Sequence, residues 1–164
     1  MSGMSVAKLV GVVRTSLESR ATRQAVIESR AASERYVRKF RQAAFFDPRF
    51  DMFIRVASAS GIAVVCFGRR LINVASWRWS VRDQAACSHG NLLAFTRETG
   101  AVPYSTLYGW VLGERCPRLS QARIVTLALG GSVTVTKLRR GAKLESYAPN
   151  EAATLGNRHA LDNR

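Results

Sequence analysis

Cysteine, histidine and acidic residues are all scarce in this chain of 164 residues. The cysteines Cys66, Cys87 and Cys116 are odd in number and lack CxxC spacing, and His89 and His159 are isolated. These residues do not form a disulfide framework or a zinc site, and they favour a reducing compartment such as the cytoplasm. The sequence also lacks a Ser/His/Asp set, a carboxylate pair, a Walker loop and an HExxH motif. We therefore expect a protein that is not an enzyme and has no cofactor or metal.

The chain has no long hydrophobic run. Its most apolar window is residues 52–68, and only the thirteen residues Val56–Gly68 are free of charge. A helical bilayer span needs about 20 apolar residues, so we expect a buried core helix or strand here. A short membrane anchor stays open as the alternative, because arginines at both ends could snorkel and tryptophans follow. The residues that support this alternative are Arg55, Arg69, Arg70, Trp77 and Trp79. The two tryptophans equally suit one face of a strand.

Acidic residues are outnumbered by basic ones, with 11 Asp and Glu against 25 Lys and Arg, and the formal net charge is +14. Such a surface attracts nucleic acid, acidic lipid or an acidic protein. The basic residues are spread along the chain, so charge alone does not choose among these partners. Nonspecific RNA or ribosome binding rests on charge only, since the sequence has no RNP-like aromatic motif.

The apolar content of 47% and the chain length indicate one or two folded domains. We divide the chain into a basic N-terminal helical region of unknown role (1–80), a DNA-binding domain (81–141) and a polar, flexible tail (142–164). Residues 4–44 are predicted to be helical, because apolar residues recur at helical spacing and neither Gly nor Pro occurs between Val12 and Asp47. This helix is interpreted as a surface helix, with a second electrostatic contact to DNA or membrane as the alternative. Its apolar segments are few and separated, which favours poor order, and residues 80–88 are expected to be a linker or a short first helix.

The stretch from Gly90 to Arg140 contains several residues that are typical of the beginnings and ends of helices. Asn91 is predicted to be the N-cap of a helix over Leu92–Thr99, and Gly100 suits the left-handed residue that ends such a helix. Pro103 suits the first turn of the next helix, which Gly113 closes. A third helix is predicted from a cap at Ser120 through Leu129. The alternation of Val and Thr over Ser132–Leu138 favours a strand.

The middle helix of this stretch is predicted to have an apolar face and a face that carries hydroxyl groups. Leu107, Trp110 and Val111 recur at i, i+3 and i+4, which defines one buried face. Small hydroxyl and phenol groups fall largely elsewhere on the helix, at Tyr104, Ser105, Thr106 and Tyr108. Such groups can reach base edges or phosphates in a major groove.

Residues 90–140 resemble the helix-turn-helix repressors of the Cro and phage-repressor type. The matching residues are Gly100, Ser105, Thr106, Leu107, Trp110, Gly113, Arg115, Pro117, Ala122, Ile124, Gly130, Gly131, Val133, Thr134 and Leu138. The resemblance implies a mainly α fold in which a small helix-turn-helix bundle follows the basic helical region. It suggests a short helix where the Val-Thr alternation favours a strand, and a strand that pairs across a dimer is a further alternative.

The function implied by the resemblance is sequence-selective binding to duplex DNA by a cytoplasmic, nucleoid-associated transcriptional repressor. The helix over residues 103–113 would read the major groove, usually as part of a homodimer on two half-sites. The candidate DNA-binding residues are Asn91, Tyr104, Ser105, Thr106, Tyr108, Arg115, Arg118, Lys137, Arg139 and Arg140. The alternative function is a basic, membrane-associated accessory subunit of a large complex, anchored by residues 52–68.

Overall fold

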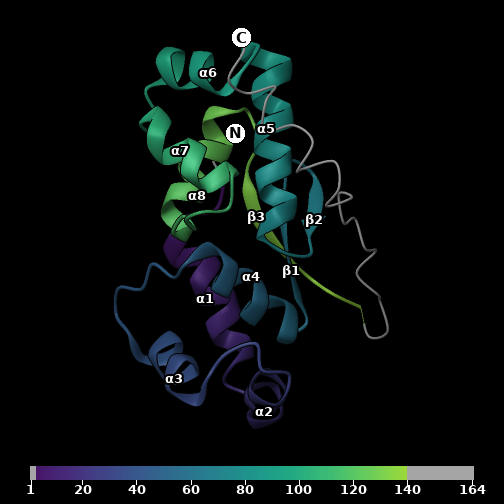
Figure 1. Cartoon of the computed structure of the whole chain (residues 1–164). Coiled ribbons are helices and arrows are strands. Elements are labelled where there is room, and N and C mark those ends of the chain that lie inside the picture. The colour runs from purple at the N-terminus through teal and green to yellow at the C-terminus, as the bar shows by residue number, and fades with distance from the viewer. Residues whose placement is uncertain (1–2, 140–164) are drawn as a thin grey trace.

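The structure is a computed structural model, and it describes residues 3–139. Within that range the chain is mainly helical, with eight helices and a small three-stranded sheet (Figure 1). The helices are α1 (Val6–Ser16), α2 (Arg20–Glu28), α3 (Glu34–Gln42), α4 (Phe50–Ala59), α5 (Val74–His89), α6 (Leu92–Thr99), α7 (Tyr104–Val111) and α8 (Leu119–Ala128). The strands are β1 (Ile62–Cys66), β2 (Arg69–Leu71) and β3 (Val133–Lys137).

The N-terminal region contains three short helices, so the single helix predicted over residues 4–44 is wrong. Each helix begins after a serine: the side chains of Ser5, Ser19 and Ser33 accept a hydrogen bond from the backbone N–H three residues further on. Helix α2 ends beside Arg30, which has a left-handed φ of 57°. A serine that caps a new helix leaves the helical conformation itself, and it therefore divides a segment that has no Gly or Pro.

These N-terminal helices belong to the same hydrophobic core as the rest of the described chain. Their buried side chains include Leu9, Val10, Val13, Leu17, Val26, Val37 and Phe40. Arg14 of α1 donates hydrogen bonds to the carbonyl oxygens of Phe40 (3.0 Å) and Ala43 (2.8 Å), where helix α3 ends and its carbonyls lack helical partners. The poor order expected of this half is therefore not observed.

The sheet joins the middle of the chain to its C-terminal part. Its strand order is β2-β1-β3 and both pairings are antiparallel. A two-residue turn, Phe67-Gly68, links β1 to β2, and β3 pairs with β1 from Ile62 opposite Lys137 to Cys66 opposite Val133. The strand predicted from the Val-Thr alternation is confirmed. It pairs within the chain, and the short helix that the resemblance suggested at these residues is not formed.

Residues 52–68 are divided between α4 and β1, so this segment is a buried helix followed by a buried strand. Within residues 3–139, no helix is long and apolar enough to cross a bilayer. The single hydrophobic anchor that the alternative function required is therefore not formed by this segment.

Helix α5 is the structural centre of the second half of the chain. It runs without interruption through the boundary expected between residues 80 and 81, and the segment 80–88, expected to be a linker or a short helix, is its C-terminal half. Trp77 of α5 is fully buried. Its indole N–H donates to Thr126 Oγ1 of α8 at 3.0 Å. Its ring lies edge-on to the ring of Phe50 of α4, with the ring centroids 5.5 Å apart. Both tryptophans of this segment lie on a helix, so their placement on a strand face is wrong.

The start of α8 is held by a residue from the N-terminal half. The Asp47 carboxylate accepts hydrogen bonds from the backbone N–H of Ser120 (2.9 Å) and from its hydroxyl. Helix α8 begins at Leu119 with Arg118 at the N-cap, so the prediction that Ser120 is the cap is wrong. A carboxylate that accepts from the first turn of a helix satisfies a free N–H and complements the helix dipole. Asp47 therefore does the capping that the local sequence assigned to Ser120.

Candidate nucleic-acid interface

Helices α6 and α7 are joined by a four-residue connection, residues 100–103. The Asn91 side-chain oxygen accepts from the Ala94 N–H at 2.8 Å at the start of α6, and Gly100 ends that helix with φ 62°. Both features were predicted, and both are confirmed. Gly100 occupies the left-handed region, which a residue with a Cβ seldom adopts. Pro103 lies at the N-cap of α7, one position before the first helical turn that was predicted for it.

One face of α7 fixes the helix to the core. Leu107 is fully buried, Trp110 is 4% exposed and Val111 is half-buried, which confirms the predicted apolar face. Both α5 and α6 pack against α7. Burial of a large apolar side chain contributes roughly 1.5–3 kcal/mol, so the orientation of α7 is determined mainly by Leu107 and Trp110.

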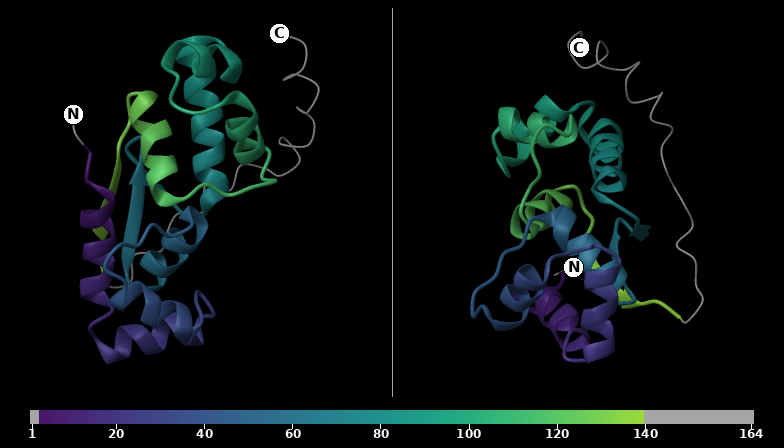
Figure 2. Two further views of the ribbon diagram at one scale, coloured as in Figure 1. Left: turned by 90° about the vertical axis from the view of Figure 1, so that its left-hand side faces the viewer. Right: turned by 60° about the horizontal axis from the view of Figure 1, so that its bottom comes forward.

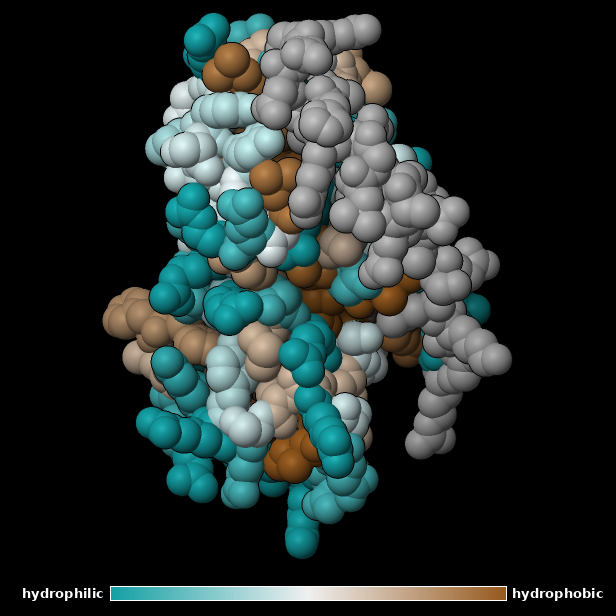
Figure 3. All heavy atoms as spheres, viewed as in Figure 1, coloured by the Kyte–Doolittle hydropathy of each residue, from teal (hydrophilic) through white to brown (hydrophobic). Residues whose placement is uncertain are grey.

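The other face of α7 carries hydroxyl groups and no charge. Ser105 is exposed, while Tyr104, Thr106 and Tyr108 are half-buried. The rings of Tyr104 and Tyr108 lie one helical turn apart, with centroids separated by 5.5 Å. Figure 3 shows pale, weakly polar side chains over α7, in contrast to the strongly hydrophilic ones around α2 and α3. We refer to these four residues as the hydroxyl face of α7.

Arg115 lies against α7 through a contact with Gly109. A Cβ built at Gly109 would lie 3.0 Å from Arg115 Nε and 3.1 Å from its Nη2, so a larger residue at this position would require the guanidinium to shift. The backbone N–H groups of Glu114 (3.0 Å) and Arg115 (3.2 Å) both donate to the Gly109 carbonyl oxygen, which holds the loop close to the helix. The structure thus brings the predicted cation Arg115 to Gly109, on the same helix as the four predicted hydroxyl groups.

A second arginine near the end of α7 was not singled out by the sequence. Arg78 of α5 is half-buried, and its Nη1 lies 3.1 Å from a Cβ built at Gly113. Its Nε is buried and has no hydrogen-bond partner among the residues that the structure describes. Nothing in the local sequence marks Arg78, because only the packing of α5 against α7 brings it to this point.

The remaining predicted residues are not gathered at α7. Asn91 uses its side-chain oxygen as the cap of α6, and Arg118 donates from Nη1 to the Asp47 carbonyl oxygen at 2.9 Å. Lys137 and Arg139 are exposed at the end of β3, on a part of the molecule away from α7 (Figures 1 and 2). Arg140 lies outside the described residues.

Two titratable groups lie near Arg49 and Asp51, which form an ion pair at 2.8 Å. Burial raises the pKa of Tyr36 to about 12, and the Asp51 carboxylate adds to this shift. Burial is also the main reason why the pKa of the Cys116 thiol is raised. Both groups are therefore neutral near neutral pH, and the Cys116 thiol is not an activated nucleophile.

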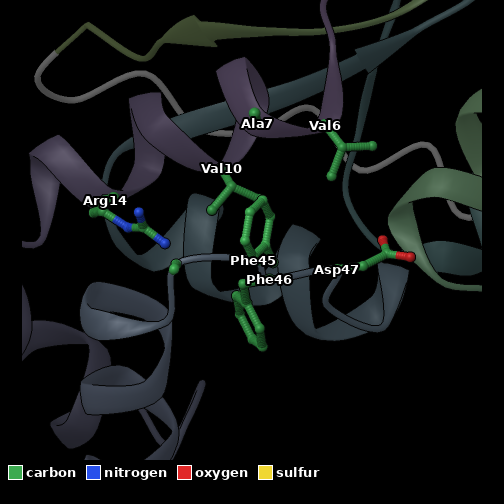
Figure 4. A pocket seen from close by; sticks show the side chains of 8 residues that line it. Val6, Ala7, Val10, Arg14, Phe45, Phe46 and Asp47 are labelled. Atoms are coloured by element: carbon green, nitrogen blue, oxygen red, sulfur yellow. The ribbon is translucent and has the colours of Figure 1, made fainter.

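A separate pocket lies between α1 and the segment that links α3 to α4 (Figure 4). Its volume is about 370 Å³, and its lining residues are Val6, Ala7, Val10, Arg14, Ala44, Phe45, Phe46 and Asp47. The guanidinium of Arg14 and the carboxylate of Asp47 are already hydrogen-bonded, to the backbone at the end of α3 and to Ser120. The pocket is thus mainly apolar, and its charged groups are engaged in holding the fold.

No group of three His, Cys, Asp or Glu side chains within residues 3–139 could hold a metal ion. Comparisons with known protein families, with curated proteins and with solved structures found no match to this chain. Its function is therefore inferred from its own residues.

Proposed function

We propose that the protein is a sequence-selective, duplex-DNA-binding transcriptional regulator, and specifically a repressor, in which α6 and α7 act as a helix-turn-helix. The observation that carries this proposal is the two-sided character of α7. Leu107 and Trp110 fix one side to α5 and α6, while the other side presents hydroxyl groups, and Arg115 contacts the same helix at Gly109. A helix held in this way can enter a major groove without exposing apolar surface.

The two kinds of side chain would have different tasks. Hydroxyl groups donate and accept hydrogen bonds, so Ser105 and Tyr108 are suited to base edges, with Tyr104 and Thr106 at the sides of the same face. Arg115 is suited to a phosphate, which positions the protein but carries no sequence information. Asn91 and Arg118, which are not gathered at α7, are proposed as contacts to the DNA backbone outside the hydroxyl face.

The proposed regulator acts as a homodimer on two half-sites about one helical turn apart, and it works in the cytoplasm on the nucleoid. Strand β3 pairs with β1 of its own chain and lies at an edge of the sheet, so a strand pairing across the dimer would use the other edge of β3. Lys137, Arg139 and Arg140 are proposed as further cationic contacts outside the α7 interface.

Selection of bound sequences from a random duplex pool at physiological salt tests this proposal. An enriched motif that contains a repeated half-site is the expected result. Ser105→Ala and Tyr108→Phe should change the selected motif, whereas Arg115→Gln should weaken binding to every sequence alike and make its salt dependence shallower. Thr15→Ala, which removes an exposed hydroxyl from α1, is the matched control and should leave the motif unchanged.

Two results would argue against the proposal. Binding without enrichment of any motif would leave only a nonspecific polycation. Equal losses on selected and random duplexes for Ser105→Ala, Tyr108→Phe and Arg115→Gln would mean that the hydroxyl face does not read bases.

A further inference from the structure

A cleft lined by arginines lies between α2 and α3, at the end of the molecule away from α6 (Figure 1). Its volume is about 280 Å³, and its lining residues are Arg20, Arg23, Gln24, Ile27, Glu34, Val37, Arg38, Arg41 and Gln42. Four of these nine side chains are guanidinium groups and one is a carboxylate. We call this feature the α2–α3 cleft.

The arginines of the cleft are poorly neutralised by the protein itself. Arg23 is tied to the backbone, with Nη1 donating to the carbonyl oxygens of Leu17 (2.9 Å) and Glu18 (2.6 Å). Arg38 faces the Glu34 carboxylate at 3.6 Å, with side-chain exposures of 65% and 76%, and such exposed pairs contribute little.

The other two arginines, Arg20 and Arg41, make no ion pair or side-chain hydrogen bond with any residue between 3 and 139. The second carboxylate of this region, Glu28, accepts a hydrogen bond from the Gln24 amide at 2.9 Å. The cleft is therefore a concave surface with an excess of positive charge.

We propose that the α2–α3 cleft binds backbone phosphates of nucleic acid and forms a second contact site distinct from α7. Guanidinium groups donate two parallel hydrogen bonds to a phosphate, and Arg20 and Arg41 project from different helices toward the same cleft. Gln24 and Gln42 line the cleft and can donate from their amides. Contacts of this kind add affinity for any sequence, so the site goes beyond the selective function proposed for α7.

The composition of the cleft favours nucleic acid over a lipid surface. The exposed large hydrophobic side chains within residues 3–139 are Ile27, Phe45 and Ile124, and only Ile27 lines the cleft. Peripheral binding to a membrane depends on buried apolar area in addition to cationic attraction. A phosphodiester backbone needs only the cations and amide donors that the cleft provides.

The first test uses the full chain and a short mixed-sequence duplex, titrated at several salt concentrations. Arg20→Gln combined with Arg41→Gln should weaken binding roughly 10-fold or more at low salt and reduce the slope of log K against log salt by about 1.8, or about 0.9 per phosphate contact. The matched control is Arg35→Gln combined with Arg70→Gln, which removes two exposed charges outside the cleft. It should change affinity by less than about 3-fold, because only long-range attraction is lost.

Glu34→Gln is expected to change the affinity for the duplex in the opposite direction. It removes the carboxylate that faces Arg38, so it should tighten binding, by about 2-fold to 3-fold. Equal behaviour of the Arg20/Arg41 variant and the Arg35/Arg70 control would overturn the cleft site, as would weaker binding by Glu34→Gln. Unchanged urea midpoints of the variants show that folding does not cause these differences.

The second test locates the contact by the shifts of backbone amide resonances on addition of duplex. Shifts in α2 and α3 are expected for the cleft and shifts in α6 and α7 for the proposed helix-turn-helix. Shifts at α6 and α7 alone would overturn the cleft and leave the regulator standing, whereas shifts at α2 and α3 alone would do the reverse. Shifts at neither place would overturn both.

Vesicles that contain phosphatidylserine provide the comparison with lipid. The cleft is expected to prefer the duplex at equal ionic strength. Tighter binding to the vesicles, abolished by the Arg20/Arg41 variant, would overturn nucleic acid as the ligand.

Discussion

The hydroxyl face of α7 and the α2–α3 cleft are two polar surfaces of opposite character. The first is a single convex helix without charged side chains, and the guanidinium of Arg115 contacts this helix at Gly109. The second is concave, lies between two helices and is lined by four arginines. Hydroxyl groups distinguish one base edge from another, whereas guanidinium groups bind any phosphate. On the proposed function, the net charge of +14 says little about selectivity, which would depend on the helix that has no charge.

The two surfaces are also supported differently. The hydroxyl face depends on one anchored helix, through Leu107 and Trp110. The cleft depends on two short helices whose buried residues, Val26, Val37 and Phe40, join the same core. Both surfaces therefore rest on one core. Substitutions in the core and at each surface test whether the two surfaces depend on it equally and bind differently.

The largest effect is expected from the aromatic anchors. Trp110→Ala and Phe40→Ala should each lower the free energy of unfolding by roughly 3–5 kcal/mol, because a large buried side chain leaves a cavity. Urea denaturation followed by fluorescence and by circular dichroism measures the loss. A single transition in both variants is expected from the shared core, and Val111→Ala, at a half-buried position, is the milder control. Separate transitions would show that the two surfaces belong to independent units. An unchanged free energy of unfolding in Trp110→Ala would show that Trp110 does not fix α7 to the core.

A smaller effect is expected where the two halves of the chain are joined. Asp47→Ala removes the acceptor for the N–H and hydroxyl of Ser120 at the start of α8. Loss of a helix cap costs roughly 0.5–2 kcal/mol, and a decrease of that size in the free energy of unfolding is expected. Asp83→Ala removes an exposed carboxylate from α5 and is the control. Equal stability of the two variants would contradict the capping role of Asp47.

Gly109→Ala separates stability from binding at the hydroxyl face. Alanine in a helix is more favourable than glycine by roughly 0.5–1 kcal/mol, so stability should not fall if the Arg115 side chain moves aside. The displaced guanidinium should then weaken duplex binding about 3-fold for all sequences. The measurement is a double-mutant cycle with Arg115→Gln, and the two changes should not be additive. Full additivity would mean that the contact between Gly109 and Arg115 does not position the cation.

The smallest effect concerns pH and a residue of α3. The pKa of Tyr36 is raised from 10.0 to about 12 in the folded protein, so the folded state binds this proton more tightly than the unfolded state does. Its contribution to stability is complete below pH 10 and is lost as the pH rises toward about 12. Tyr36→Phe should flatten the decline in the urea midpoint over this range. Parallel pH profiles for the two proteins would show that Tyr36 is not perturbed by burial.

Sequence reasoning was most successful where the chain contains residues with a single strong backbone preference. The two ends of α6 were predicted from Asn91 and Gly100, and Gly100 also predicted the start of the connection to α7. The buried face of α7 was predicted from the spacing of Leu107 and Trp110. It failed in residues 4–44, because the serines that divide this segment compete with the helix only weakly in isolation. The α2–α3 cleft was missed for the same reason, since the arginines of one long helix would point in all directions.

The sequence by itself determined the mainly helical composition, the strand over 133–137 and the two faces of α7, because these follow from local preference and periodicity. Tertiary structure decided which distant residues meet. It placed Asp47 at the start of α8, Arg115 on Gly109, and the arginines of α2 and α3 around one cleft. These long-range contacts form because the helices and the sheet pack around one hydrophobic core, and the residues of that core come from distant parts of the chain. No local pattern can therefore specify them.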